Sequence, residues 1–270
     1  MNELTPISTS APSLHPIIFC GAGPGDPELI TVKGQKALNQ ADIIVYAGSL
    51  VPEAVLRWKN TKAETINSAS LHLDEIIAIL AENYFDGRKV VRLHTGDPAL
   101  YGAIFEQMAK LYEKEIPYLV IPGVTAAFAA AATMGIEYTL PEISQTLILT
   151  RMAGRTPVPE MENLRSLAAH QASMAIYLSI TLVDKVAAVL TDAYGPDSPC
   201  AIVYRASQPE ERIVYTTADH LVETVKKEKI THQALIIASR VLEVVPHNMK
   251  TFSKLYDKGF AHGYRKAEEE

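Results

Sequence analysis

The sequence predicts two α/β domains, the first built on a mostly parallel sheet and the second on a mixed sheet. Strand-like and helix-like segments alternate through the first half, which is the pattern of a parallel sheet covered by helices. Glycine-containing turns follow several of these strands, as they do where ligand-facing loops leave an open α/β sheet. In the second half, two strand-like runs stand so close together that they indicate an antiparallel hairpin, and hence a mixed sheet.

The first domain is expected over residues 14–122. Its strands are short apolar runs, and its helices show amphipathic spacing, as in the segment where Leu29, Val32 and Leu38 are the apolar residues. In chain order we expect strands at 16–20, 42–46, 89–93 and 118–121, and helices at 29–40, 71–85 and 101–112.

The second domain is expected over residues 123–252. It opens with an alanine-rich helix, residues 123–134, and Pro141 then breaks any helix in the connection that follows. We expect strands at 146–150, 173–179, 200–205, 212–216 and 234–238, and helices at 162–170, 181–194 and 217–227.

Composition excludes several classes of protein. The 270 residues are 48% hydrophobic, enough for a sizeable core, yet no apolar run approaches the ~18 residues that a membrane span needs. A net charge of −6 argues against a general nucleic-acid binder, which presents a basic face to phosphates. The eight histidines are scattered and form no metal-binding motif, so we expect no metal site.

The cysteines and the termini favour a cytoplasmic protein. Cys20 and Cys200 form neither a disulfide framework nor a zinc motif, which suits a reducing compartment. Residues 1–13 lack the basic start and apolar stretch of a secretory signal, and we expect a loose tail there. The charged residues 263–270 read as a solvated extension.

The turn GAGPGDPELIT, Gly21 to Thr31, is the strongest local signal. A dinucleotide-binding turn would have glycine where Asp26 stands, and this carboxylate would repel a pyrophosphate, so NAD binding is disfavoured. No GK[ST] follows the glycines, which excludes a P-loop. A tight turn with Asp26 as a helix N-cap would account for the motif without any ligand.

Two more segments have the same order of strand, glycine-containing loop and helix. HTGDPALYG, His94 to Gly102, also follows a strand and precedes a helix, and IPGVTAAFAAAATMG, Ile121 to Gly135, leads from a strand into the alanine-rich helix. Asp97 could cap the helix after it, and small residues near Thr125 would let a flat ligand approach, although tight helix–sheet packing also needs small residues. Because parallel strands end on one edge, the first two loops should lie together.

Together these segments resemble the tetrapyrrole methylase family, which uses S-adenosylmethionine, over about residues 14–250. VYAGSLV (Val45 to Val51) and AIVYRASQPEE (Ala201 to Glu211) look most like members that methylate precorrin-4 or cobalt-precorrin-4 at C-11 in cobalamin synthesis. Relatives that methylate uroporphyrinogen III read GGDP where this chain has Thr95 first, which favours a later corrin-pathway substrate.

The resemblance implies an S-adenosylmethionine site in a cleft between the two domains. The substrate would face Gly23, Gly25 and Asp26, and a base, if one is needed, would be Asp26, His94 or Tyr101. The matching cofactor positions are Pro24, Thr95, Gly96, Asp97, Pro98, Leu100, Tyr101, Thr125, Ala126, Leu178, Ala201, Val203, Ala234 and Leu235.

A tetrapyrrole substrate carries many carboxylates, which the net charge of −6 would repel, so local cations are required. Arginine suits this role because its fork pairs with a carboxylate through two hydrogen bonds. The candidates near the motifs are Arg92, Arg151, Arg155 and Arg205, besides His94, and each could instead make a structural ion pair.

The resemblance also implies a homodimer. Four other readings stay open: another tetrapyrrole methylase acting on uroporphyrinogen III or a different precorrin, an RNA methyltransferase of the same superfamily, a non-enzymatic cofactor-binding module, and a nicotinamide oxidoreductase. The acidic balance disfavours the RNA enzyme, and Asp26 disfavours the oxidoreductase.

Overall fold

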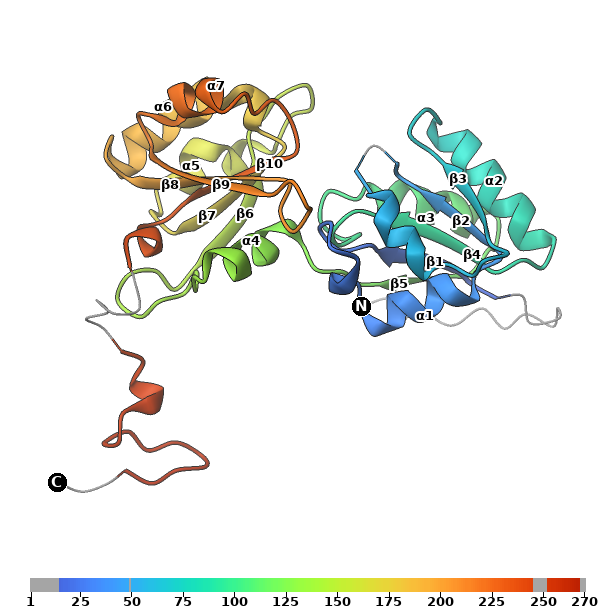
Figure 1. Ribbon diagram of the computed structural model, residues 1–270, viewed down its shortest axis with the longest axis horizontal. Helices are drawn as coiled ribbons and strands as arrows, with labels where there is room; N and C mark the ends of the chain where they lie inside the picture. Colours follow the sequence, from blue (N-terminus) through green and yellow to red (C-terminus); the bar gives the residue numbers. More distant parts are fainter. Residues whose placement is uncertain (1–14, 49, 245–251, 268–270) are drawn as a thin grey trace. The chain divides into compact units, whose positions relative to one another are not determined.

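A computed structural model describes residues 15–48, 50–244 and 252–267. The predicted N-terminal tail, residues 1–13, lies outside the described residues. The chain divides into two compact units, one ending at Ala126 and the other beginning at Ala127. Each unit contains one five-stranded sheet with helices packed on it (Figure 1), so the prediction of two α/β domains is confirmed. No helix among the described residues is long and apolar enough to cross a membrane.

The first unit is built on a fully parallel sheet with strand order β3-β2-β4-β1-β5. Its central strands β4 and β1 are buried on both faces, as parallel strands between helices are. The elements are β1 (Ile17–Gly21), η1 (Pro27–Leu29), α1 (Val32–Gln40), β2 (Ile43–Tyr46), η2 (Glu53–Trp58), β3 (Glu64–Asn67), α2 (Leu73–Phe85), β4 (Val90–His94), α3 (Ile104–Glu113) and β5 (Tyr118–Ile121).

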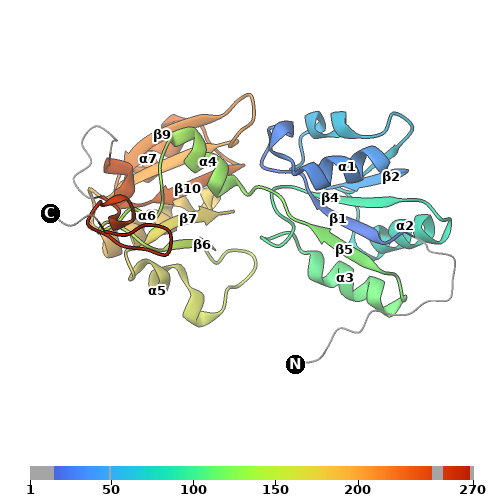
Figure 2. The same cartoon turned by 90° about the horizontal axis from the view of Figure 1, so that it is seen from below.

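Helices cover both faces of this sheet (Figure 2). On one face, α1 and η2 contribute Leu38 and Val55 to a core with Cys20 of β1. On the other, α2 and α3 contribute Leu80 and Leu111 to a core with β1 and β4. Each helix thus buries one stripe. In α1 this stripe is Gly34, Ala37 and Leu38, whereas Val32, one of the apolar positions named from sequence, is 67% exposed.

The second unit is built on a mixed sheet with strand order β6-β7-β10-β8-β9. Only β6 and β7 are parallel neighbours, and β8 with β9 forms the predicted antiparallel hairpin. The elements are α4 (Ala126–Met134), β6 (Leu147–Arg151), η3 (Glu160–Glu162), α5 (Leu164–Ala168), β7 (Ser173–Tyr177), η4 (Ile180–Leu182), α6 (Val183–Tyr194), β8 (Pro199–Tyr204), β9 (Arg212–Thr217), α7 (Leu221–Lys227), β10 (Ala234–Ala238), η5 (Arg240–Glu243) and, beyond residue 251, η7 (Lys254–Tyr256).

The two faces of the second sheet carry different helices. Helices α5, α6 and α7 pack on one face through a core that includes Leu164, Leu190 and Leu221, and α4 lies on the other face (Figure 1). Buried alanines, Ala127 and Ala130 among them, let α4 come close to the sheet.

The structure differs from the sequence expectations most clearly at one strand and one helix, and the helices expected from residues 101, 123 and 217 also begin three or four residues later, at Ile104, Ala126 and Leu221. Strand β3 was not expected, because its residues are mostly exposed at the sheet edge and show no apolar alternation. The helix expected from Leu29 begins at Val32, because Asp26 caps a separate 3₁₀ turn and Thr31 then caps α1.

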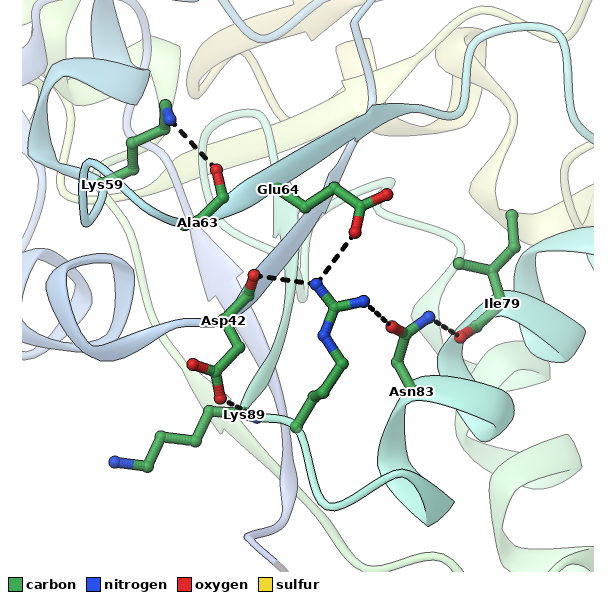
Figure 3. A network of polar contacts seen from close by, with 8 residues as sticks. Asp42, Lys59, Ala63, Glu64, Ile79, Asn83 and Lys89 are labelled. Atoms are coloured by element: carbon green, nitrogen blue, oxygen red, sulfur yellow. Dashed lines mark hydrogen bonds and ion pairs between the residues drawn. The ribbon is translucent and has the colours of Figure 1, made fainter.

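A network of polar contacts closes the amino edge of the first sheet, opposite the motif loops (Figure 3). Arg88 donates to the carbonyl oxygen of Asp42 (3.2 Å), to Oε2 of Glu64 (2.9 Å) and to Oδ1 of Asn83. Because these partners are the first residue of β3, a residue in the last turn of α2 and the residue before β2, Arg88 joins the beginnings of β2 and β3 to the end of α2. This edge has a structural role.

Candidate functional site

The loops after β1 and β4 meet at the carboxyl edge of the first sheet. Ala22 donates its backbone N–H to the carbonyl oxygen of His94 (2.7 Å). Gly23 and Gly96 exchange backbone hydrogen bonds of 2.8 and 3.3 Å. The prediction that these two loops lie together is therefore confirmed. The sequence motifs form one continuous backbone surface at this edge.

The loop after β5 joins the same cluster through glycines. A Cβ atom added to Gly123 would lie 2.1 Å from the carbonyl oxygen of Gly96 and 2.9 Å from Cα of Gly21. A Cβ atom on Gly21 would lie 2.7 Å from Cα of Gly123. These distances leave no room for a side chain, so Gly21, Gly96 and Gly123 define a three-glycine contact of the three loops.

Asp97 fixes two of these loops to each other. Its Oδ1 accepts the N–H of Ala99 (2.8 Å) within a turn. Asp97 is therefore not the helix cap expected from sequence, because α3 begins only at Ile104 and has Ala103 as its N-cap. Oδ2 of Asp97 accepts the N–H of Gly123 (2.9 Å) across to the loop after β5. The second bond was not predicted, because nothing in the sequence shows that these distant residues meet.

Asp26 caps the turn that follows the first motif. Its Oδ1 accepts the N–H of Glu28 (2.8 Å), so the N-cap interpretation is confirmed. The indole N–H of Trp58 donates to the carbonyl oxygen of Pro27 (2.8 Å) and holds the loop from the η2 side. Asp26 is only partly buried, whereas Gly23, Pro24 and Gly25 before it are buried.

Arg92 and His94 point into the first unit. Arg92 is 4% exposed and donates to Gln107 Oε1 (3.1 Å), Ser68 Oγ (2.9 Å) and the carbonyl oxygen of Val45 (3.2 Å). Burial lowers the pKa of its guanidinium to about 10. This corrects our expectation for Arg92, because a buried guanidinium bonded to three groups of its own unit is not free to pair with a substrate carboxylate.

His94 is 4% exposed, stacks on Phe19 and leaves its Nε2 without a hydrogen-bond partner. Burial, with a smaller contribution from the positive charge of Arg92, lowers the pKa of His94 to about 3. The imidazole is therefore neutral at pH 7, and so acidic an imidazolium corresponds to a weak base.

The second loop continues into strained backbone. Tyr101 has a φ of 56° and is 44% exposed. A positive φ is unfavourable for a residue with a side chain, and such strain concentrates at functional sites. Along the same loop, Thr95, Gly96, Asp97 and Leu100 are partly exposed and Pro98 is buried.

The cofactor positions expected in the second unit gather at one edge of its sheet. Leu178 directly follows β7, and Leu235 of β10 pairs in register with Val203 of β8. Leu178 has a φ of 52° and is nevertheless 62% exposed, so an apolar side chain is held in solvent by strained backbone. Ala234 lies at the same edge, whereas Ala201 lies further along β8 and is buried.

Two tyrosines of the second unit hold the start of α4. The N–H of Ala127 donates to the hydroxyl of Tyr177 (2.9 Å), and the hydroxyl of Tyr138 donates to the carbonyl oxygen of Ala127 (2.9 Å). The first N–H groups of a helix have no acceptor within the helix, and here the hydroxyl of Tyr177 is the acceptor for one of them. The neighbouring Thr125 and Ala126 are expected cofactor contacts, so these hydroxyls fix the backbone next to them. The sequence gives no signal for either tyrosine beyond its place among apolar residues.

The other expected cations have partners or lie in a loop. Arg151 donates to the carbonyl oxygens of Thr156 (3.2 Å) and Pro157 (2.6 Å) and closes the loop in which the exposed Arg155 lies. Arg205 donates to Gln233 Oε1 (2.9 Å) and pairs with Glu210 (3.4 Å). Their roles toward a substrate stay predictions.

Comparisons with known proteins agree with this arrangement. The model of the tetrapyrrole (corrin/porphyrin) methylases matches residues 16–222. The chain is 51% identical to a cobalt-precorrin-4 C(11)-methyltransferase of Methanocaldococcus jannaschii, over 93% of this chain and 96% of that protein. The crystal structure of a cobalt-precorrin-4 methyltransferase, CbiF, is similar with a TM-score of 0.81 and 45% identity, covering 84% of this chain and 95% of that one.

A further solved structure contains a cofactor product. It is a uroporphyrin-III C-methyltransferase of Thermus thermophilus complexed with S-adenosylhomocysteine. It is similar to this chain with a TM-score of 0.72 and 27% identity, covering 86% of this chain and all of that one.

Proposed function

Since this chain belongs to the tetrapyrrole methylase family, we propose that it transfers the methyl group of S-adenosylmethionine to C-11 of precorrin-4 or cobalt-precorrin-4 in cobalamin biosynthesis. The observation that carries the proposal is the 51% identity to a cobalt-precorrin-4 C(11)-methyltransferase, which extends over nearly the whole length of both chains. The joined loops at the carboxyl edge of the first sheet support it, because the motifs of the resemblance lie in them.

The residues present fit S-adenosylmethionine. This cofactor supplies a methyl group on a positively charged sulfur and carries no phosphate, so a phosphate-binding glycine loop is not needed. Adenine is held by apolar contacts and backbone hydrogen bonds. The turn from Thr95 to Pro98 offers a closely approachable backbone at Gly96, and Leu178 offers an exposed apolar side chain.

The protein's task in this reaction is placement. Holding the reacting carbon and the methyl group in line contributes up to about 7–11 kcal/mol in favourable cases. The three-glycine contact and the Asp97 hydrogen bonds keep the first-unit loops in one arrangement, which is the property that placement requires. Tyr138 and Tyr177 fix the backbone beside Thr125 and Ala126.

If the macrocycle loses a proton to the protein, Asp26 or Tyr101 is the better candidate. Both are at least partly exposed, whereas His94 is buried and its pKa lies near 3. A general base works best when its pKa lies near the operating pH, and it must reach the proton it removes.

We also propose that the chain acts as a homodimer in the cytoplasm. The family resemblance supports the dimer, and two cysteines that both remain free thiols suit a reducing compartment. Light scattering coupled to size-exclusion chromatography measures the mass in solution, and a monomeric mass would contradict the dimer.

The direct test is turnover. The protein is incubated with methyl-labelled S-adenosylmethionine and either precorrin-4 or cobalt-precorrin-4, with uroporphyrinogen III as a comparison substrate, and the product is examined by NMR. We expect the label at C-11 of the corrin precursor. Label at another carbon, or methylation of uroporphyrinogen III alone, would overturn the proposal.

A further inference from the structure

The turn that carries Asp26 has a fixed internal shape. Oδ1 of Asp26 accepts the N–H of Glu28 (2.8 Å), and its carbonyl oxygen accepts the N–H of Leu29 (3.0 Å). Bonds within a turn fix the positions of its residues relative to one another, but they leave the orientation of the turn relative to the sheet undetermined. A contact with another element must therefore set the direction in which the Asp26 carboxylate points.

Element η2 makes this contact. The indole N–H of Trp58 donates to the carbonyl oxygen of Pro27 (2.8 Å), 31 residues earlier in the chain. Nη2 of Arg57 pairs with Oε1 of Glu28 (3.1 Å), and the Arg57 guanidinium lies over the Trp58 ring, 4.6 Å from the ring centroid. Pro27 and Glu28 directly follow Asp26. Two side chains of η2 thus hold the two residues next to the carboxylate.

The two contacts are not of equal strength. The side chains of Arg57 and Glu28 are 46% and 76% exposed, and an ion pair as exposed as this one contributes little, because water and salt screen it. The hydrogen bond of Trp58 is partly buried and joins two neutral groups, so salt does not screen it. The orientation of the turn therefore depends mainly on Trp58.

Element η2 is a rigid support because it is packed on a hydrophobic core of the first unit. Val55 is fully buried, Val51 just before η2 is 3% exposed, and the Trp58 ring packs on the same core. Side chains that are locked by packing can hold a loop in one place. The segment VYAGSLV, Val45 to Val51, leads into η2. This segment is part of the resemblance to enzymes that methylate C-11, and a supporting role for η2 gives it a function.

We propose that Trp58 is a positioning residue for the tetrapyrrole substrate, because it holds the Pro27 carbonyl group and so sets the position of the Asp26 carboxylate. This role rests on the proposed function, in which Asp26 lies on the substrate side. A carboxylate only accepts hydrogen bonds, so the partner of Asp26 on the macrocycle is a pyrrole N–H and not a substrate carboxylate. Hydrogen bonds weaken steeply with misalignment, so a small rotation of the turn weakens substrate binding. Trp58 acts through Asp26 and need not touch the substrate.

Trp58→Phe in the full-length chain tests this role, because it removes the N–H donor and keeps an aromatic ring. The matched control is Tyr194→Phe, which also removes one donor that an aromatic ring carries, here to the carbonyl oxygen of Ala172 in the second unit. Should Trp58→Phe fail to fold, β-(3-benzothienyl)alanine is placed at position 58 instead, since this analogue has sulfur in place of the N–H and a ring of the same shape.

The readouts separate substrate from cofactor. We measure the KM for the corrin precursor and, by anaerobic calorimetry, the Kd for S-adenosylhomocysteine and for uroporphyrinogen III, a reduced macrocycle that carries N–H groups on its pyrrole rings. Trp58→Phe should raise this KM and the uroporphyrinogen Kd about fivefold, as the loss of one hydrogen bond implies. The Kd for S-adenosylhomocysteine should not change, because the bonds between Gly23 and Gly96 hold the neighbouring Pro24 independently. Tyr194→Phe should match the wild type in all three.

A double-mutant cycle shows whether Trp58 acts through Asp26. Asp26→Asn keeps an oxygen that can cap the N–H of Glu28 but removes the negative charge. In this background the position of the side chain matters less, so Trp58→Phe should raise the uroporphyrinogen Kd by less than about twofold. The same fivefold rise in both backgrounds would overturn the positioning role, because the effect of Trp58 would then be independent of the carboxylate.

The role of Trp58 and the proposed function fail in different ways. If the wild type methylates the corrin precursor and Trp58→Phe equals it in KM and in uroporphyrinogen binding, the positioning role is wrong and the proposed function stands. An equal rise in the Kd for S-adenosylhomocysteine would indicate a general loss of structure and would also overturn the role. If the wild type methylates no tetrapyrrole, the function fails, and the uroporphyrinogen titrations decide the role of Trp58 by themselves: weaker binding confined to Trp58→Phe supports it, and equal or absent binding overturns it.

Discussion

Some single residues of this protein adopt backbone conformations that lower its stability. Leu178 keeps a positive φ of 52° and exposes 62% of its surface, although glycine or asparagine would tolerate that backbone better. We propose that this apolar side chain is kept against both preferences because it binds the cofactor. Tyr101, in the loop after β4 of the first sheet, also has an unfavourable positive φ.

We expect Leu178→Asn to separate stability from binding. Asparagine tolerates the left-handed region, so the free energy of unfolding should stay equal or rise by up to about 1 kcal/mol. Loss of the apolar contact should weaken S-adenosylhomocysteine binding about tenfold. Urea unfolding and calorimetry measure the two quantities. Unchanged affinity would remove Leu178 from the cofactor site.

His94 should make the protein lose stability in acid. In the folded state its pKa is about 3, below the ordinary value of 6.5, so between these pH values only the unfolded chain takes up this proton. Stability from this residue is therefore complete above about pH 6.5 and is lost as the pH falls toward 3, at up to about 1.4 kcal/mol per pH unit.

The measurement compares His94→Phe with the wild type by urea unfolding at several pH values. The variant should be at least as stable at pH 7, because it removes a buried nitrogen without a partner. It should also lose less stability between pH 6.5 and 4. His170→Gln, at an exposed position, serves as the control and should follow the wild type. Parallel curves for wild type and His94→Phe would contradict the low pKa.

At the scale of elements, the start of α4 depends on hydroxyl groups of the second unit. Tyr177→Phe leaves the N–H of Ala127 without this partner, which should cost about 1–3 kcal/mol of stability and loosen the backbone at Thr125 and Ala126. We expect the KM for S-adenosylmethionine to rise several-fold while kcat changes less. Tyr194→Phe also removes one hydroxyl hydrogen bond, to Ala172, and should lower stability alone. Equal KM values for the two variants would refute the positioning role.

The three-glycine contact makes a second prediction at this scale. Gly123→Ala places a Cβ atom 2.1 Å from the carbonyl oxygen of Gly96, so the loops must move apart at a cost of about 1–3 kcal/mol or more. The melting temperature and S-adenosylhomocysteine affinity should fall together. Gly154→Ala, which meets only a flexible side-chain carbon of Leu182 at 3.1 Å, should change neither greatly.

At the scale of the whole molecule, the sequence pattern correctly predicted the two-domain α/β architecture and the grouping of the loops after β1 and β4. Alternation of strands and helices predicted the parallel sheet, and parallel strands necessarily end on one edge. The exposed strand β3 was missed because it lacks an apolar pattern. The burial of Arg92 was missed for a different reason: a strand covered on both faces buries its polar residue as well, and alternation then says nothing about exposure.

Contacts between distant residues lay beyond sequence reasoning. The hydrogen bond from Gly123 to Asp97 and the bond from Ala127 to Tyr177 each depend on register and loop path, which no local pattern encodes. The same holds for Arg265, whose charge suggested solvent and whose side chain instead closes a loop. Local chemistry thus predicted strands, helices and the grouping of loops more reliably than the contacts between residues that are distant in the sequence.

The three-glycine contact also limits how this enzyme can be redesigned. Because Gly21 and Gly123 have no space for even one methyl group, libraries that randomise those positions would mostly yield misfolded chains. New substrate preferences would have to come from side chains of the neighbouring first-unit loops that are at least partly exposed, such as Asp26 and Tyr101. The closely packed backbone and the adjustable side chains are thus separate parts of this sheet edge.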